Sequence, residues 1–111
     1  MIIGTHAMIF SKDADADRAF LRDVLEIPCI DSGGGWLIFA LPPAELGVHG
    51  GDNGFHQVYL ICDDVEAFVA NMAAKGVTCG GIQSEPWGRI TSVPLPGGGT
   101  LGVYQATHAR P

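Results

Sequence analysis

The stretch DDVEAFVANMAAKGV, residues 63–77, carries the clearest helix signal in this chain of 111 residues. Asp63 and Asp64 open it and can accept hydrogen bonds from first-turn amides, as helix-capping residues do. Lys75 and Gly76 close it, since a basic residue followed by glycine favours a helix C-terminus. Between them, apolar residues recur with the period of a helix that lies on a sheet; they are Val65, Phe68, Val69, Met72 and Ala73. The stretch therefore predicts a capped amphipathic helix.

Short apolar segments flank this helix on both sides. One strand is predicted before it at His56–Cys62, and another after it at Val77–Ile82. Two more strands are predicted at Arg89–Leu95 and Leu101–Gln105, and they are joined by a tight turn at Pro96–Gly99. The second half of the chain is therefore expected to run strand, helix and three strands.

The first half of the chain shows the same order of signals. Ile2–Phe10 is apolar on both faces and predicts a covered strand. A helix is expected between Ser11 and Pro28, because an acidic run favours the positive end of a helix and proline ends one. Further strands are predicted at 36–41 and 45–49. The sequence GGDNG at 50–54 is the predicted linker between the two halves.

Four residue types recur after about fifty positions, which predicts a duplicated unit. A duplicated unit fixes the architecture and usually places the site between its copies. The recurring pairs are His6 and His56, Asp13 and Asp63, Cys29 and Cys79, and Trp36 and Trp87.

Three regions of the sequence resemble signatures of the vicinal oxygen chelate superfamily, which contains glyoxalase I, bleomycin-resistance proteins and extradiol dioxygenases. FLRDVLEI at 20–27 is similar to the first-helix signature of that family. DDVEAF at 63–68, with KGV at 75–77, is similar to the second-helix signature. PWGR at 86–89, followed by LPGG at 95–98, resembles the closing hairpin. The resemblance extends over nearly the whole chain.

This resemblance implies an α+β fold of two βαβββ modules, whose mixed sheets curve into an open cup with the helices on the outside. We expect one domain over residues 1–111, with modules at about 2–50 and 55–105 and a tail at 106–111. Members of the family commonly complete the cup by dimerisation, so a homodimer that binds a small-molecule ligand is expected. The modules are free to pair within one chain or across two chains.

Metal-chelating members of the family hold a divalent ion, such as Zn, Ni, Fe or Mn, with one side chain from each of four strands. His6 and His49 match the first and second of these positions. Family spacing selects Gln57 for the third position, whereas the fifty-residue offset selects His56, and strand alternation lets only one of the two face the cup. The fourth position, usually glutamate, is Gly102. Three ligands without a carboxylate would hold a metal loosely.

Two functions follow from this incomplete ligand set. The first is a metal-dependent lyase, isomerase or dioxygenase, although glyoxalase I activity is disfavoured because Gly102 cannot supply the base that glutamate provides. The second is a metal-free protein that sequesters a cationic or aromatic small molecule, as bleomycin-resistance members do. Gly102 would then open space at the bottom of the cup. Five aromatic residues are expected to line or rim the cup; they are Trp36, Phe39, Tyr59, Trp87 and Tyr104.

The composition argues against several other classes of function. A net charge of −6 with only six basic residues disfavours a nucleic-acid surface. No apolar stretch approaches the roughly 20 residues of a membrane span, and the N-terminus lacks the basic start of a signal peptide. Three cysteines without a CxxC pair indicate buried thiols in a reducing cytoplasm.

Overall fold

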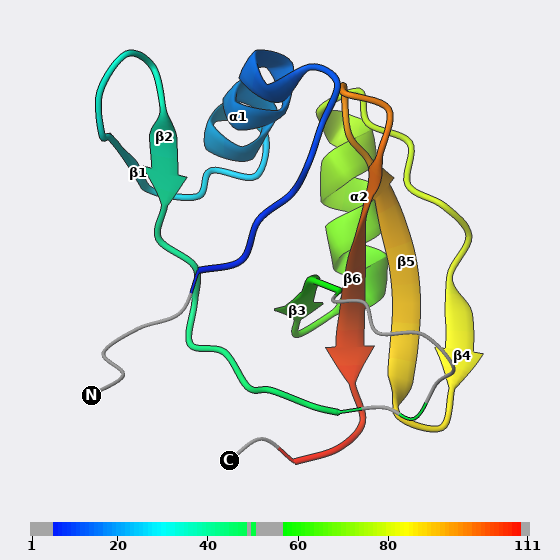
Figure 1. The fold of residues 1–111 in the computed structure, drawn as a ribbon. Helices are drawn as coiled ribbons and strands as arrows, with labels where there is room; N and C mark the ends of the chain where they lie inside the picture. The colour runs from blue at the N-terminus through cyan, green and yellow to red at the C-terminus, as the bar shows by residue number, and fades with distance from the viewer. Residues whose placement is uncertain (1–5, 49, 51–56, 110–111) are drawn as a thin grey trace.

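The computed structural model describes residues 6–48, 50 and 57–109, which form an α+β fold with a two-stranded and a four-stranded sheet (Figure 1). Among these residues, no helix is both long and apolar enough to cross a bilayer. In chain order the elements are α1 (Ala14–Asp23), β1 (Cys29–Asp31), β2 (Leu37–Phe39), β3 (Tyr59–Cys62), α2 (Val65–Ala74), β4 (Gln83–Glu85), β5 (Gly88–Pro94) and β6 (Thr100–Ala106).

Helix α2 confirms the helix predicted from the DDVEAFVANMAAKGV stretch. The Asp64 carboxylate accepts a hydrogen bond from the Ala67 amide at 3.0 Å, as an N-cap residue should. Val65 and Met72 are buried on the face that meets the sheet. Gly76 ends the helix with φ +80°, a left-handed conformation that glycine adopts without steric cost.

Replacing Asp64 by alanine is expected to lower the free energy of unfolding by about 1 kcal/mol, because the Ala67 amide loses its capping acceptor. Asp63→Ala is the matched control, since Asp63 lies one residue outside the cap. Urea denaturation of the two variants measures the difference. Equal losses in both variants would show that Asp64 is not the N-cap.

The four-stranded sheet has the order β3-β6-β5-β4. Strands β3 and β6 pair in parallel, and α2, β4 and β5 lie between them in the sequence. Strands β5 and β6 pair antiparallel as a hairpin, and β4 pairs antiparallel with β5. The second half of the chain therefore has the predicted order of strand, helix and three strands.

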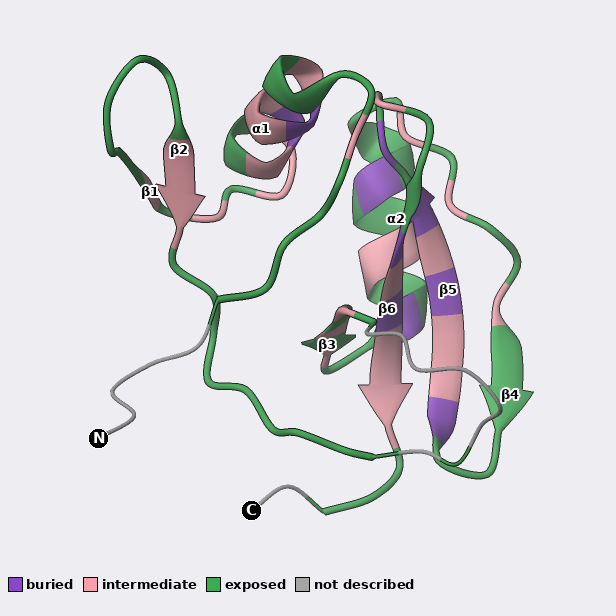
Figure 2. Ribbon diagram, viewed as in Figure 1, coloured by how far each residue is buried: buried purple, intermediate pink, exposed green. Residues whose placement is uncertain are grey.

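The main core lies on one face of this sheet (Figure 2). Val93 of β5 and Val103 of β6 are almost completely buried, and residues of α2 and of β3 pack against them. Phe20 of α1 belongs to the same buried cluster. The first half of the chain thus contributes a helix to a core that the second half builds.

The first half differs from its predicted βαβββ order. Helix α1 forms, with Asp13 as its N-cap, and β1 pairs with β2 as a short antiparallel hairpin. The described parts of the strands predicted at 2–10 and 45–49 contain no regular strand. Paired βαβββ modules are therefore not resolved. The pairing partners of such strands are distant in sequence, so local signals alone do not form them.

The strand predicted at Val77–Ile82 is also displaced, and β4 begins at Gln83 instead. The preceding segment still lies beside β5, where the Gly80 amide donates to the Ser92 carbonyl at 2.8 Å. The Thr91 hydroxyl then donates to the Gly80 carbonyl at 2.8 Å, in place of a backbone ladder bond. A side chain thus replaces part of the regular pairing at this point.

Polar contacts join the two halves of the chain. The Asp17 carboxylate of α1 is 6% exposed and accepts a hydrogen bond from the Gly97 amide, in the turn between β5 and β6, at 2.7 Å. The Lys75 ammonium, at the end of α2, donates to the Val24 carbonyl at the end of α1 at 2.6 Å. These bonds hold α1 against the C-terminal hairpin and α2 within a single chain.

Candidate ligand-binding cleft

The face of the four-stranded sheet opposite α2 is only partly covered. Side chains alternate between the two faces of a strand, so residues next to the buried Val93 and Val103 project to the other side. The residues of this open face include Tyr59, Ile61, Ile90, Ser92, Gly102 and Tyr104. Tyr59 and Ile61 remain more than a third exposed. An apolar surface with this exposure is the natural candidate for a ligand site.

Tyr59, Gly102 and Ser92 form one row across β3, β6 and β5, since Tyr59 pairs with Gly102 and Gly102 pairs with Ser92. The tyrosine ring covers the glycine: a Cβ built on Gly102 would lie 2.5 Å from both Cδ1 and Cε1 of Tyr59. The expectation that Gly102 leaves open space at the bottom of the cup is therefore wrong. A neighbouring aromatic ring fills the space that the missing side chain vacates.

Three of the predicted aromatic residues, including Tyr59 of this row, form a cluster of contacting rings. The ring centroids of Tyr59 and Trp87 are 6.3 Å apart, those of Tyr59 and Tyr104 are 5.7 Å apart, and those of Trp87 and Tyr104 are 5.1 Å apart. Each pair is nearly perpendicular, which is a favourable edge-to-face arrangement. The cluster holds the Tyr59 ring in place over Gly102.

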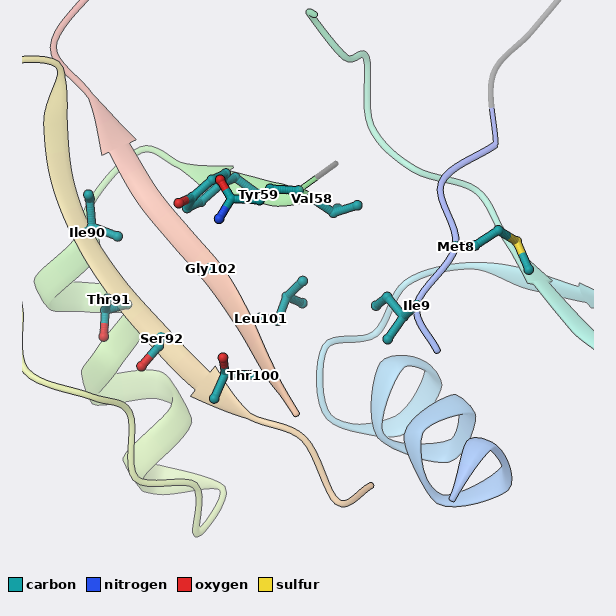
Figure 3. A pocket seen from close by; sticks show the side chains of 11 residues that line it. Met8, Ile9, Val58, Tyr59, Ile90, Thr91, Ser92, Thr100, Leu101 and Gly102 are labelled. Carbon is teal, nitrogen blue, oxygen red and sulfur yellow. The ribbon is translucent and has the colours of Figure 1, made fainter. Parts of the chain in front are cut away.

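A cleft with a volume of about 440 Å³ lies between this open face and the N-terminal segment that precedes α1 (Figure 3). Figure 3 shows Met8 and Ile9 across the cleft from the strands, with Tyr59 and Gly102 on the sheet side. Its volume falls in the range of small-molecule sites. The lining residues that the structure describes are Met8, Ile9, Gln57, Val58, Tyr59, Ile90, Thr91, Ser92, Thr100, Leu101 and Gly102.

Sequence reasoning missed eight of the residues that line this cleft; they are Met8, Ile9, Val58, Ile90, Thr91, Ser92, Thr100 and Leu101. The β5 sequence places one hydroxyl and one branched apolar residue on each face, so its alternation does not tell which face packs on α2. The N-terminal segment was expected to be a covered strand, and a covered strand would not offer Met8 and Ile9 to a cleft.

The other two predicted aromatic residues belong to the small sheet. Trp36 lies beside β2, where the Arg18 guanidinium sits over its indole with the Cζ atom 4.8 Å from the ring centre. Phe39 ends β2 and is half-buried. Figure 1 places this hairpin on the other side of α1 from the four-stranded sheet. The structure therefore brings together three of the five predicted aromatics, and of these Tyr59 lines the cleft.

The predicted metal ligands are only partly within the described residues. Gln57 lines the cleft, and His6 is exposed in the N-terminal segment. His49 and the alternative His56 lie outside the described residues. Within the stretches 6–48 and 57–109, no three His, Cys, Asp or Glu side chains are grouped as a metal site requires. At the fourth position the Tyr59 ring stands where a glutamate would project, so the residues present do not fit the four-ligand site.

Charged and thiol groups near the sheet have structural partners or are shielded by burial. Arg89 forms an ion pair with Glu66 of α2. Burial raises the pKa of the Cys62 thiol, and it also raises the pKa of the Cys79 thiol. Both thiols pack against the core, as small apolar residues do. With raised pKa values they stay protonated at neutral pH, and they are therefore poor nucleophiles.

Comparison with known proteins supports the fold. The sequence matches no family model and no protein of the curated set. Among solved structures, TnmS3, an antibiotic binding protein from Streptomyces sp. CB03234, superposes with a TM-score of 0.68 at 21% identity, over 96% of this chain and 100% of that chain. The lactoylglutathione lyase from Agrobacterium tumefaciens superposes with a TM-score of 0.65 at 18% identity, over 87% and 88%.

A glyoxalase/bleomycin resistance protein from Streptomyces sp. CB03234 superposes with a TM-score of 0.54 at 20% identity, over 86% of this chain and 93% of that chain. The chain has the vicinal oxygen chelate fold. At these identities the likeness establishes the architecture and leaves the chemistry to the residues of the site. Within this fold, the chain places Tyr59 over Gly102, the residue that the sequence resemblance predicts at the fourth ligand position.

Proposed function

We propose that this protein binds a small molecule in the cleft between Met8 and the open face of the sheet, without using a metal. The observation that carries the proposal is the Tyr59 ring lying on Gly102, which puts an aromatic surface at the position of the family's fourth metal ligand. The cleft has the volume of a small-molecule site, and its lining combines apolar and polar surface. The similarity in fold to an antibiotic binding protein supports the same function.

The cleft is suited to hold a ligand through apolar contact and a few hydrogen bonds. Ile90 and Ile9 supply apolar surface, and Met8 adds a flexible side chain that adapts to different shapes. Of the five aromatic residues singled out in the sequence, Tyr59 is proposed to contact the ligand, and Trp87 and Tyr104 to hold its ring. Trp36 and Phe39 lie on the small sheet and are not proposed as contacts in this cleft. A lyase, isomerase or dioxygenase function has less support, because among the described residues the Tyr59 ring occupies the space of the fourth ligand and no three His, Cys, Asp or Glu side chains are grouped.

We infer that the working form is a homodimer in the cytoplasm. Phe10, Leu46 and Val48 are each more than 90% exposed, on the two segments where the sequence predicts strands. A second copy of the chain would bury these side chains and complete the cup. The three cysteines are free thiols, as a reducing compartment would keep them. The domain is proposed to comprise both modules, at about 2–50 and 55–105.

Tryptophan fluorescence tests the binding function directly. Trp87 contacts Tyr59, so a ligand seated on Tyr59 should change Trp87 emission, whereas Trp36 lies on the other sheet. Chelator-treated Trp36→Phe protein is titrated with two flat probes, neutral acridone and cationic N-methylacridinium. Saturable quenching by either probe is expected, and Tyr59→Leu should weaken it about tenfold, as the loss of one aromatic anchor does.

Matched variants separate this result from nonspecific quenching. Trp87→Phe should remove most of the signal in otherwise wild-type protein, while Trp36→Phe should retain it. Quenching that never saturates, or that needs an added divalent metal, would overturn the proposed function.

A further inference from the structure

The cleft contains hydrogen-bonding groups but no charge among its described lining residues. The polar side chains on its open side are one amide, from Gln57, and two hydroxyls, from Ser92 and Thr100. Thr91 also borders the cleft but is only 3% exposed, and its side chain lies on the core face of β5 with Val93. The Thr91 hydroxyl already donates to the Gly80 carbonyl. The groups left for a ligand are therefore neutral ones that can both donate and accept hydrogen bonds.

The negative charge of the protein is located elsewhere in the described structure. Glu66 on α2 is paired with Arg89, and Asp17 of α1 bonds to the Gly97 amide. Asp13 and Asp64 accept from the first-turn amides of their own helices. A net charge of −6 is therefore a poor guide to the ligand. A cation that entered the cleft would lose water without meeting a described carboxylate, which is unfavourable.

The row of Tyr59, Gly102 and Ser92 also indicates the shape of the ligand. Tyr59 is 39% exposed and its ring has two perpendicular neighbours, so the residue offers an aromatic surface to the cleft. The Ser92 hydroxyl lies on the same face two strands away from Tyr59. A flat molecule with polar groups on its edge would contact the ring and bond to the hydroxyls together.

We propose that the cleft selects an uncharged, flat molecule with carbonyl or hydroxyl groups on its edge, in preference to a cation of the same shape. This inference rests on the proposed binding function and names the class of its ligand. It narrows the sequence-based expectation of a cationic or aromatic ligand to an uncharged aromatic one.

Acridone and N-methylacridinium test the inference, because they share a three-ring frame and differ in charge. Fluorescence anisotropy of each probe gives its affinity for chelator-treated protein. Acridone is expected to bind at least about tenfold more tightly than the cation. Equal binding, or tighter binding of the cation, would overturn the inference and leave the binding function standing. If neither probe binds, the proposed function fails together with the inference.

A designed change of preference makes the test sharper. Thr100→Asp places a carboxylate in the cleft and is expected to tighten cation binding by up to about fivefold, as one exposed ion pair would. Thr100→Asn has nearly the same shape without the charge and should leave cation binding unchanged. Ser84→Asp adds the same charge on the exposed β4, outside the cleft, and should also have no effect. If both aspartate variants gain the same affinity for the cation, the charge of the cleft lining does not determine which probe binds.

Discussion

Gly102→Ala is expected to lower the free energy of unfolding by about 1–3 kcal/mol, although alanine usually suits a strand better than glycine. The added Cβ would lie 2.5 Å from two carbons of the Tyr59 ring, so the ring must leave its position over β6. Gly102→Glu carries the same Cβ and should lose at least as much free energy of unfolding, even though glutamate is the residue that the family usually has there. Urea denaturation measures both losses, and acridone affinity should fall with them.

Two further variants separate this clash from a general intolerance of substitution. Gly81→Ala is the matched control, because a Cβ at Gly81 would meet open space. It should change stability by less than about 0.5 kcal/mol. The double variant Tyr59→Leu, Gly102→Ala should lose less free energy of unfolding than the two single variants lose together, since the leucine can move aside. Full additivity would contradict the described packing of Tyr59 on Gly102.

Asp17→Ala is expected to cost about 1.5–3 kcal/mol of stability, since it removes a charged acceptor and leaves the Gly97 amide without its partner. The hydrogen bond is 2.7 Å long, and the aspartate is 6% exposed. Losing it should loosen the contact between α1 and the hairpin of β5 and β6. Asp17→Asn, which keeps an acceptor oxygen, should lose less. Urea denaturation of the variants measures the effect.

Asp15→Ala is the matched control, because it lies in the same first turn of α1 and has the same charge. Its carboxylate side chain is 94% exposed and pairs with Arg18 on the surface. Such pairs contribute at most about 1 kcal/mol. Equal losses of stability in Asp15→Ala and Asp17→Ala would show that the Asp17–Gly97 contact between the two halves of the chain does not stabilise the fold.

The sequence was a good guide to the second half of the chain because its signals there are local. The helix period, the capping Asp64 and the terminal Gly76 all lie within α2 or next to it, and each is confirmed. The hairpin of β5 and β6 likewise depends on a short turn. Local signals of this kind specify an element before any distant contact is made.

The first half was predicted less well because its outer strands depend on distant partners. Residues 6–10 and 45–48 have the apolar content of strands, yet the described structure contains no strand there. An apolar run shows that a segment tends to be covered, and it does not say which segment covers it. The proposed homodimer would supply such a partner.

The site was predicted only in outline because its key contact joins two strands that are far apart in sequence. Gly102 was recognised as the departure from the family's ligand set, and Tyr59 as a cup residue. The parallel register of β3 and β6 places the Tyr59 side chain on Gly102. That register follows from the complete sheet and cannot be read from either strand alone.

Amide chemical shifts of the chelator-treated protein, recorded with and without acridone, test the central claim most directly. If the ligand sits on the open face, the largest changes should fall on residues 57–59, 90–92 and 100–102, which line the cleft. The surface helix residues of α2 should change little. Shifts confined to the hairpin of β1 and β2, or shifts that appear only after a divalent metal is added, would contradict a metal-free site built on Tyr59 and Gly102.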